Sequence, residues 1–214
     1  MTRRWLGHRE QPLARPWREA EYVVVDVETT GLDLKRDAIA SYGAVVIRDG
    51  RIVVSENTYG LVSAGCEMTA ASTAVHTLRR VDIADAPPPS HAVAVLDTLL
   101  QNRILVAHAA WIEQAFLSRA FAAHGAALCC PVIDTAALAR AEGIAPRSSR
   151  REPNLEWLAE TIGLPAVNPH HALGDATTTA QVFLALTSRL GRLGYRTALD
   201  FVDLTAGDRA LKRR

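Results

Sequence analysis

Cysteine is scarce in this chain. Three cysteines, Cys66, Cys129 and Cys130, occur among 214 residues, and they form neither a Cys-x-x-Cys pair nor an even set. A disulfide framework is therefore not expected, and a reducing, cytoplasmic setting is predicted. The adjacent Cys129 and Cys130 are expected to be buried as small apolar side chains rather than to bind a metal.

Long apolar runs and a large net charge are also missing. No uninterrupted apolar run approaches the ~18 residues of a membrane span. No apolar segment follows the basic N-terminus Met1–Gly7, so no secretory signal is expected there. Lys and Arg number 24 against 23 Asp and Glu, a net charge of +1. This balance argues against broad electrostatic capture of duplex nucleic acid. The 49% hydrophobic content fits one compact domain.

The most informative segment of the chain holds two closely spaced carboxylates. Val23, Val24 and Val25 predict a buried strand, which continues through Asp26, Val27 and Glu28 into a turn at Gly31. Alternate strand residues share a face, so Asp26 and Glu28 should lie side by side. Two such charges repel each other unless a cation shares them, and paired oxygens of this kind suit Mg²⁺ or Mn²⁺. The alternative is a solvated strand end with two unrelated acids.

The rest of the chain alternates between predicted strands and helices. Asp49-Gly50 predicts a hairpin turn, because β-forming residues flank it on both sides. The expected strands are 23–27, 39–47, 51–59, 104–107 and 132–135, and the last of them is expected to pass into a helix through an Asp or Thr cap. The other expected helices are 91–100, 110–124, 154–162, which Asn154 should cap, and 174–193. This order predicts a mixed sheet flanked by helices.

Two further acids begin predicted helices. Glu113 lies in the first turn of the helix that follows the strand 104–107, and Asp175 opens the last predicted helix just after His170-His171. Each can be explained as an ordinary first-turn acid that is favoured by the helix dipole. Their occurrence together with Asp26 and Glu28 suggests a single acidic site.

With these residues in view, the chain resembles the DnaQ-like 3′–5′ exonucleases, the DEDD group of the ribonuclease H-like fold. The first motif of that family, Asp-x-Glu-Thr-Thr-Gly, matches residues 26–31. The second matches residues 106–108 and Phe116-Leu117, and the third, a His five residues before an Asp, matches His170 and Asp175. Residues 74–77 (Ala-Val-His-Thr) stand where the family often has a similar connecting segment.

The resemblance implies an α/β fold with a mixed five-stranded sheet and helices on both faces. The implied division is an N-terminal arm at 1–20, a catalytic domain at 21–193 and a C-terminal extension at 194–214. The arm is expected either to pack on the domain or to stay loose.

Two positions depart from the family pattern. The family usually has Asn after the His of its second motif and Asp at the metal position, where this chain has Ala109 and Glu113. Glu keeps the charge but extends the carboxylate by about 1.5 Å, one C–C bond. A second subgroup of the family has Tyr four residues before the last Asp, but that position is His171 here, so the chain matches the His subgroup with His170 at the catalytic spacing. His171 lies one helical turn before Asp175 and is the alternative partner of Asp175, although a packing or substrate-side role is expected for it.

The resemblance also implies a mechanism and its residues. Two Mg²⁺ or Mn²⁺ ions would be held by Asp26, Glu28, Glu113 and Asp175, and His170 would take a proton from the attacking water. The residues expected to bind the substrate are Thr29, Thr30, Leu32, Trp111, Arg147 and Arg150. For Trp111, stacking on a base and packing in the core are both possible.

The implied activity is removal of nucleotides from the 3′ end of a nucleic acid, with single-stranded ends and DNA favoured. An exoribonuclease is one alternative, because the motifs do not report the 2′-hydroxyl. A non-catalytic metal- or nucleic-acid-binding module on the same fold is another, and Ala109 and Glu113 support it. A polymerase or repair protein is a possible partner, and no membrane association is expected.

Overall fold

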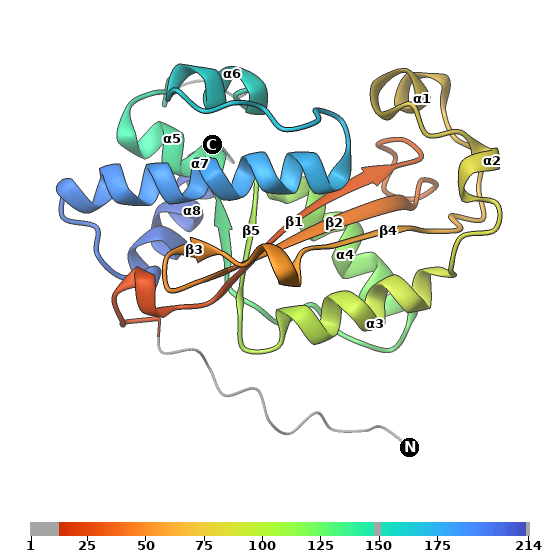
Figure 1. Ribbon diagram of the computed structural model, residues 1–214, viewed down its shortest axis with the longest axis horizontal. Helices are drawn as coiled ribbons and strands as arrows, with labels where there is room; N and C mark the ends of the chain where they lie inside the picture. Colours follow the sequence, from red (N-terminus) through yellow and green to blue (C-terminus); the bar gives the residue numbers. More distant parts are fainter. Residues whose placement is uncertain (1–12, 148–150, 213–214) are drawn as a thin grey trace.

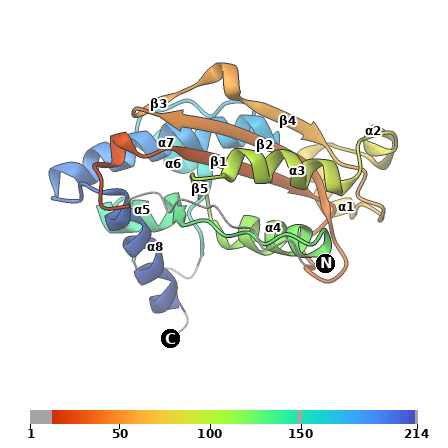
Figure 2. The ribbon, with the colours of Figure 1, turned by 90° about the horizontal axis from the view of Figure 1, so that it is seen from below.

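A mixed β-sheet lies between two layers of helices in the computed structural model, which describes residues 13–147 and 151–212 (Figures 1 and 2). The strands are β1 (Tyr22–Thr29), β2 (Ile39–Arg48), β3 (Arg51–Ile52), β4 (Thr58–Leu61), β5 (Ile104–Ala107) and β6 (Val132–Asp134). The helices are α1 (Ala70–His76), α2 (Arg80–Ile83), α3 (Pro89–Leu100), α4 (Trp111–Ala123), α5 (Thr135–Glu142), α6 (Leu155–Thr161), α7 (Ala172–Arg192) and α8 (Ala198–Lys212), with short 3₁₀ turns η1 (Trp17–Glu19) and η2 (Val54–Glu56).

The sheet has the order β3-β2-β1-β5-β6, and β4 also pairs with β2. β1 runs antiparallel to β2 and parallel to β5, which is parallel to β6. The single return strand expected at 51–59 is divided by η2, so that β3 and β4 both pair with β2. The six strands thus occupy five positions across the sheet, and the mixed sheet predicted from the sequence is confirmed.

The alternation along β1 directs its side chains to two separate cores. Tyr22 and Val24 join the core beneath α5, α6, α7 and α8, whereas Val23, Val25 and Val27 join the core beneath α3 and α4. Asp26 and Glu28 therefore share the face covered by α7, as their spacing predicts.

Two predicted helix starts have the caps expected from the sequence. Asp134 accepts a hydrogen bond from the amide of Ala136 at the start of α5, and Asn154 accepts one from the amide of Trp157 at the start of α6. These caps satisfy amides that have no partner within the helix.

Both ends of the described chain pack on the domain. Trp17 is buried, meets Phe183 edge-on at 6.4 Å, and its carbonyl accepts a 2.6 Å hydrogen bond from the hydroxyl of Tyr22. Residues 13–20 of the expected arm therefore pack on the domain, and residues 1–12 lie outside the described residues. The expected C-terminal extension contains α8, which buries Phe201.

Three helices were not expected from the sequence. These are α1, α2 and α8, of which the first two are only seven and four residues long. The prediction that Cys129 and Cys130 are buried is wrong, because Cys129 is exposed and Cys130 is half-buried in the loop before β6. No helix among the described residues is long and apolar enough to cross a membrane.

Candidate active site

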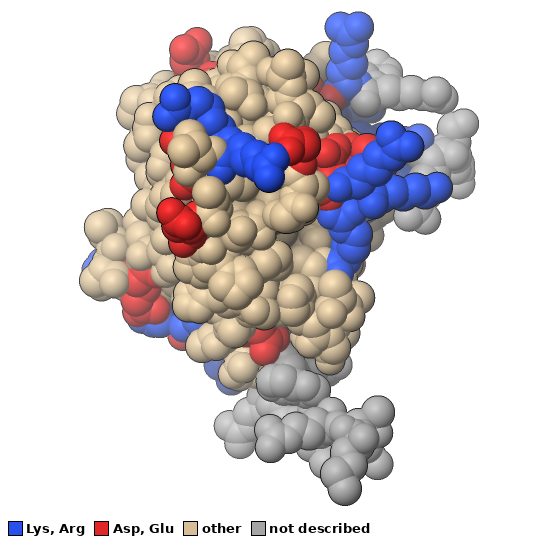
Figure 3. Space-filling view, turned by 90° about the vertical axis from the view of Figure 1, so that its right-hand side faces the viewer, with Lys and Arg blue, Asp and Glu red and all other residues tan. Residues whose placement is uncertain are grey.

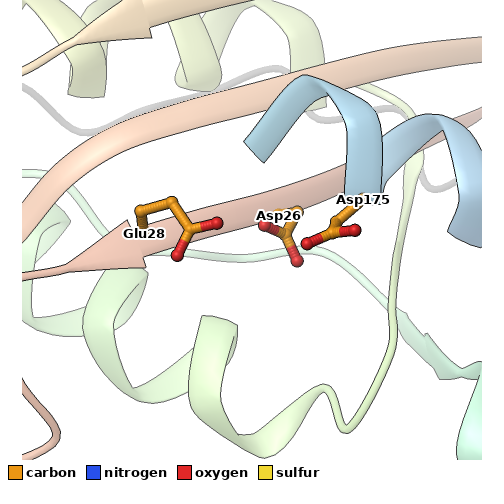
Figure 4. A group of neighbouring side chains, drawn as sticks. All are labelled: Asp26, Glu28 and Asp175. Carbon is orange, nitrogen blue, oxygen red and sulfur yellow. The ribbon is translucent and has the colours of Figure 1, made fainter. Parts of the chain in front are cut away.

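Three carboxylates meet where β1 passes beneath the start of α7. One oxygen from each of Asp26, Glu28 and Asp175 lies within 4.8 Å of the others. Figure 4 shows the Asp26 carboxylate facing that of Asp175, with Glu28 beside it along β1. The start of α7 can approach the sheet because Asp26 pairs with Gly43 on β2, where a Cβ atom would lie 2.3 Å from the backbone of Ala172.

The environment of these groups disfavours three negative charges. Burial raises the pKa of Asp26 well above its usual range, and the charges of Glu113, Glu28 and Asp175 raise it further. Burial, with the charge of Asp175, raises the pKa of Glu28 to about 7. Burial raises the pKa of Asp175 to about 6, although the amide of His170 donates to it. A bound cation would offset this repulsion.

Glu113 lies near this group but outside the set of three that meet closely. Its side chain is 5% exposed in the first turn of α4, and its Oε2 atom has no hydrogen-bond partner among the described residues. Burial raises its pKa well above the usual range, and the charges of Asp134 and Glu28 add to this effect. A buried carboxylate oxygen without a partner fits a cation that binds there directly or through water.

The two neighbouring histidines have different surroundings. The His170 amide donates a 2.9 Å hydrogen bond to Asp175 Oδ2, and its half-exposed ring lies with Nε2 3.6 Å from Glu156 Oε1. His171 stacks on Tyr59 with ring centroids 4.4 Å apart. The structure thus attaches His170 to the acidic group and gives His171 a packing contact.

The start of the second motif is held by hydrogen bonds. His108 Nε2 donates to the carbonyl of Pro153 at 2.7 Å, so the neutral ring accepts from the hydroxyl of Thr135 at Nδ1, at 2.8 Å. Ala109 follows with a φ of 52°. Asn tolerates this left-handed region better than Ala does, which gives a local reason for the Asn that the family usually has here.

The residues expected to bind substrate differ in how available they are. Leu32 is 72% exposed and Trp111 is 51% exposed, so the core-packing alternative for Trp111 is wrong. The hydroxyls of Thr29 and Thr30 are buried and donate to Gly31 O and Asp37 Oδ1. The carbonyls of both residues and the amide of Thr30 also have hydrogen-bond partners within the protein.

Of the two arginines expected at the substrate, one can be placed. Arg147 donates to the carbonyls of Arg140 and Ala141 at the end of α5. Arg150 lies outside the described residues. On the face drawn in Figure 3, the right-hand side of Figure 1, Lys and Arg lie in separate groups and not as one continuous basic surface, as the net charge of +1 leads one to expect.

Two residues at the site were not found by sequence reasoning. His76 is buried, accepts from the amide of Leu78 at Nδ1, and donates from Nε2 to the carbonyl of Thr29 at 3.1 Å. Glu156 faces His170. The segment 74–77 was a signal for His76, but nothing in the spacing along the chain indicated Glu156.

The fold and the acidic group define a class of enzyme that matches known proteins. The model of the RNase_T exonuclease family matches residues 23–183. The chain belongs to this exonuclease family, which confirms the expected fold and class of enzyme.

Curated relatives come from bacterial DNA polymerases and related proteins. The chain is 35% identical over 186 residues to a DNA polymerase III subunit epsilon-like protein of Rhodobacter capsulatus, covering 85% of this chain and 26% of that protein. It is 33% identical over 176 residues to a PolC-type DNA polymerase III of Thermotoga petrophila, covering 82% of this chain and 12% of that protein. The chain thus spans only a small part of these relatives.

Solved structures share the fold. Exonuclease X in complex with 5′ overhanging duplex DNA has a TM-score of 0.67 at 24% identity, covering 86% of this chain and 99% of that one. Exonuclease I of E. coli in complex with a dA16 oligonucleotide has a TM-score of 0.68 at 14% identity, covering 81% and 42%. At these identities the similarity shows the fold alone.

Proposed function

We propose that this chain is a divalent-cation-dependent exonuclease that removes nucleotides from the 3′ end of DNA. The observation that carries the proposal is the group of Asp26, Glu28 and Asp175, whose oxygens lie within 4.8 Å of one another. The DNA named for exonuclease X and exonuclease I, and the polymerase names of the curated relatives, support DNA as the substrate.

The acidic group would hold Mg²⁺ or Mn²⁺. Asp26, Glu28 and Asp175 offer the close oxygens, and the free Oε2 of Glu113 offers another at the edge of the group. Divalent ions held there, two of them if the chain follows the family's mechanism, would supply a Lewis acid to activate water and stabilise charge on phosphate oxygens. Because Glu113 departs from the usual ligand, we expect Mn²⁺, which tolerates more varied ligand geometry, to support higher activity than Mg²⁺.

His170 would accept the proton of the attacking water. Its ring is half-exposed, so the proton can pass on to solvent, and its main chain is tied to Asp175. Glu156 Oε1 lies 3.6 Å from Nε2 of this ring. The chain therefore places a titratable ring next to the carboxylates without using it as a structural hydrogen-bond donor in the core.

The terminal nucleotide would lie between β1 and α4. Thr29 and Thr30 follow Glu28 directly and would line this space, although their hydroxyls and carbonyls already have partners. The exposed side chains of Leu32 and Trp111 can contact bases. Arg147 would contact a backbone phosphate only with the donors that do not already bind Arg140 and Ala141. Arg150 remains a candidate for the same role, and a polymerase or repair protein remains a candidate partner.

A non-catalytic binding module is the second candidate function. The observation that favours it is that Glu113 is not one of the three carboxylates that meet closely. An exoribonuclease would use the same residues on a different substrate.

Oligonucleotides labelled at the 5′ end test these proposals together. Matched DNA and RNA, single- and double-stranded, are incubated with Mg²⁺, Mn²⁺ or excess chelator. We expect a ladder of shortening DNA products with either metal and no products in chelator. Cleavage of a closed circle, or undiminished activity in chelator, would refute the proposal. Binding of single strands without hydrolysis would favour the binding module, and preferred cleavage of RNA would favour the exoribonuclease.

A further inference from the structure

Four charged residues join α8 to the loop that precedes α6. Arg140 of α5 is 2% exposed and donates to Glu152 at 2.7 Å and to Asp208 of α8 at 3.1 Å. Lys212 of α8 binds the same two acids, at 2.7 Å and 3.0 Å. Arg140, Glu152, Asp208 and Lys212 are called the C-terminal ion cluster below. Its acids are mostly buried, so their charges interact in a medium that screens them weakly.

The loop held by this cluster also touches the second motif. Pro153, the residue after Glu152, accepts the 2.7 Å hydrogen bond from His108 Nε2. His108 follows β5 and precedes the first turn of α4, which contains Glu113. Arg140 donates in addition to the carbonyl of Arg151, so the loop is bound on both sides of Glu152.

The same loop leads into α6 and so to the third motif. Asn154 caps α6, and two residues later Glu156 Oε1 lies 3.6 Å from His170 Nε2. α8 makes a second contact beside the site, where the hydroxyl of Thr205 accepts from the amide of Asp134 at 2.9 Å. Asp134 is the residue whose charge acts most strongly on Glu113.

We propose that Glu152 is a positioning residue of the active site, through which α8 holds His108 and Glu156 in place. The proposal is based on the contacts that connect Lys212 of α8 to Glu152, and the adjacent Pro153 to His108. The role rests on the exonuclease function proposed above. By this proposal α8 (residues 198–212) contributes to catalysis, although it lies beyond residues 23–183, which the family model matches.

Glu152→Gln tests this role because it removes the charge that Arg140 and Lys212 share while keeping the shape of the side chain. We expect kcat to fall about 10–100-fold, the effect of a displacement on the order of 1 Å, with KM changed less than about twofold. Lys212→Met should show a smaller loss of the same kind, and Lys212→Arg, which keeps the charge, should restore most of the activity. If Glu152→Gln does not fold, Lys212→Met tests the same role, because it removes the partner charge of Glu152.

Glu21→Gln is the matched control. Glu21 binds Arg103 at 2.8 Å and Arg48 at 3.1 Å, in an ion cluster beside the first residue of β1, at the end away from the carboxylates. We expect this variant to lose thermal stability while keeping kcat. If Glu21→Gln and Glu152→Gln lower kcat equally, or if Glu152→Gln lowers only the unfolding temperature, the proposal is wrong.

Amide hydrogen exchange gives a readout that does not depend on activity. In Glu152→Gln we expect faster exchange at residues 108–113 and 155–157, and unchanged exchange in the control. If the wild type hydrolyses nothing with either metal, the exonuclease proposal fails, and the exchange data alone then decide whether Glu152 positions these residues. Unchanged exchange in Glu152→Gln would overturn the role.

Discussion

His170 and His171 are adjacent in the chain but do different things in the fold. The His170 ring is half-exposed with Nε2 3.6 Å from Glu156 Oε1, and its amide donates to Asp175, whereas His171 stacks on Tyr59. We expect His170→Ala to lower kcat by ~10²–10⁴-fold, the usual contribution of a general base, with metal binding retained. His171→Ala should be much milder. Single-turnover cleavage and calorimetric titration with Mn²⁺ measure the two properties, and the reverse order of effects would show that the spacing was misassigned.

Glu113 gives a second prediction at the residue scale, because its buried Oε2 has no partner among the described residues. Glu113→Gln should lower activity by about 10–100-fold if the carboxylate acts on the metal through water. The same change should raise the thermal unfolding temperature in chelator, since it removes an acid that folding must either protonate or bury as a charge. Glu113→Asp, which restores the usual family side chain, should keep more activity than Glu113→Gln. Unchanged nuclease activity in Glu113→Gln would show that Glu113 is only an acid in the first turn of α4 and does not act on the metal.

At the scale of elements, the close approach of α7 to β2 brings Asp175 to Asp26. A Cβ atom at Gly43 would lie 2.3 Å from the backbone of Ala172 and Leu173, so Gly43→Ala must push the start of α7 away from the sheet. We expect a loss of about 1–3 kcal/mol in the free energy of unfolding, measured with urea, and a loss of activity larger than the unfolded fraction explains.

Gly191→Ala in the same helix is the control for this prediction. A Cβ atom there would have no heavy atom within 4 Å among the described residues beyond its chain neighbours and the adjacent backbone of α7. Because Ala is the better helix former, Gly191→Ala should stabilise the protein by up to about 1 kcal/mol without affecting activity. Equal stability of the two variants would mean that α7 does not need this close contact.

For the whole molecule, the raised pKa values predict how stability depends on pH and metal. With pKa values of about 7 for Glu28 and about 6 for Asp175, the folded protein binds more protons than the unfolded chain between roughly pH 4 and pH 7. The stability that these groups contribute is therefore present at low pH and is lost as the pH rises through the folded values.

Thermal unfolding in chelator and in Mg²⁺ measures this effect. The midpoint in chelator should fall between about pH 5 and pH 7.5, and Mg²⁺ should raise it most at the higher pH, because the ion binds the ionised carboxylates of the folded protein. Glu28→Gln with Asp175→Asn should flatten the pH dependence and remove the effect of Mg²⁺. A midpoint in chelator that rises over the same range would contradict the expected sign.

The sequence by itself determined most of the local elements and which residues of β1 share a face of the sheet. The Val-rich β1, the hairpin at Asp49-Gly50 and the caps at Asp134 and Asn154 depend on interactions within a few residues, so their patterns are visible along the chain. The motifs likewise identified Asp26, Glu28 and Asp175, because strand period and helix starts place them at one edge.

Only the tertiary structure decided which distant residues touch. Glu113 lies outside the close group of carboxylates, and Glu156 contacts His170. α8 is linked through Glu152 and its neighbour Pro153 to His108. Each of these arrangements depends on segments that are separated in the sequence. No local pattern records such contacts, since they depend on how closely helices pack on the sheet and on which buried charges find partners. The short helix α1, which holds the carbonyls of Thr29 and Thr30, was missed for the same reason: tertiary contacts stabilise it more than its own seven residues do.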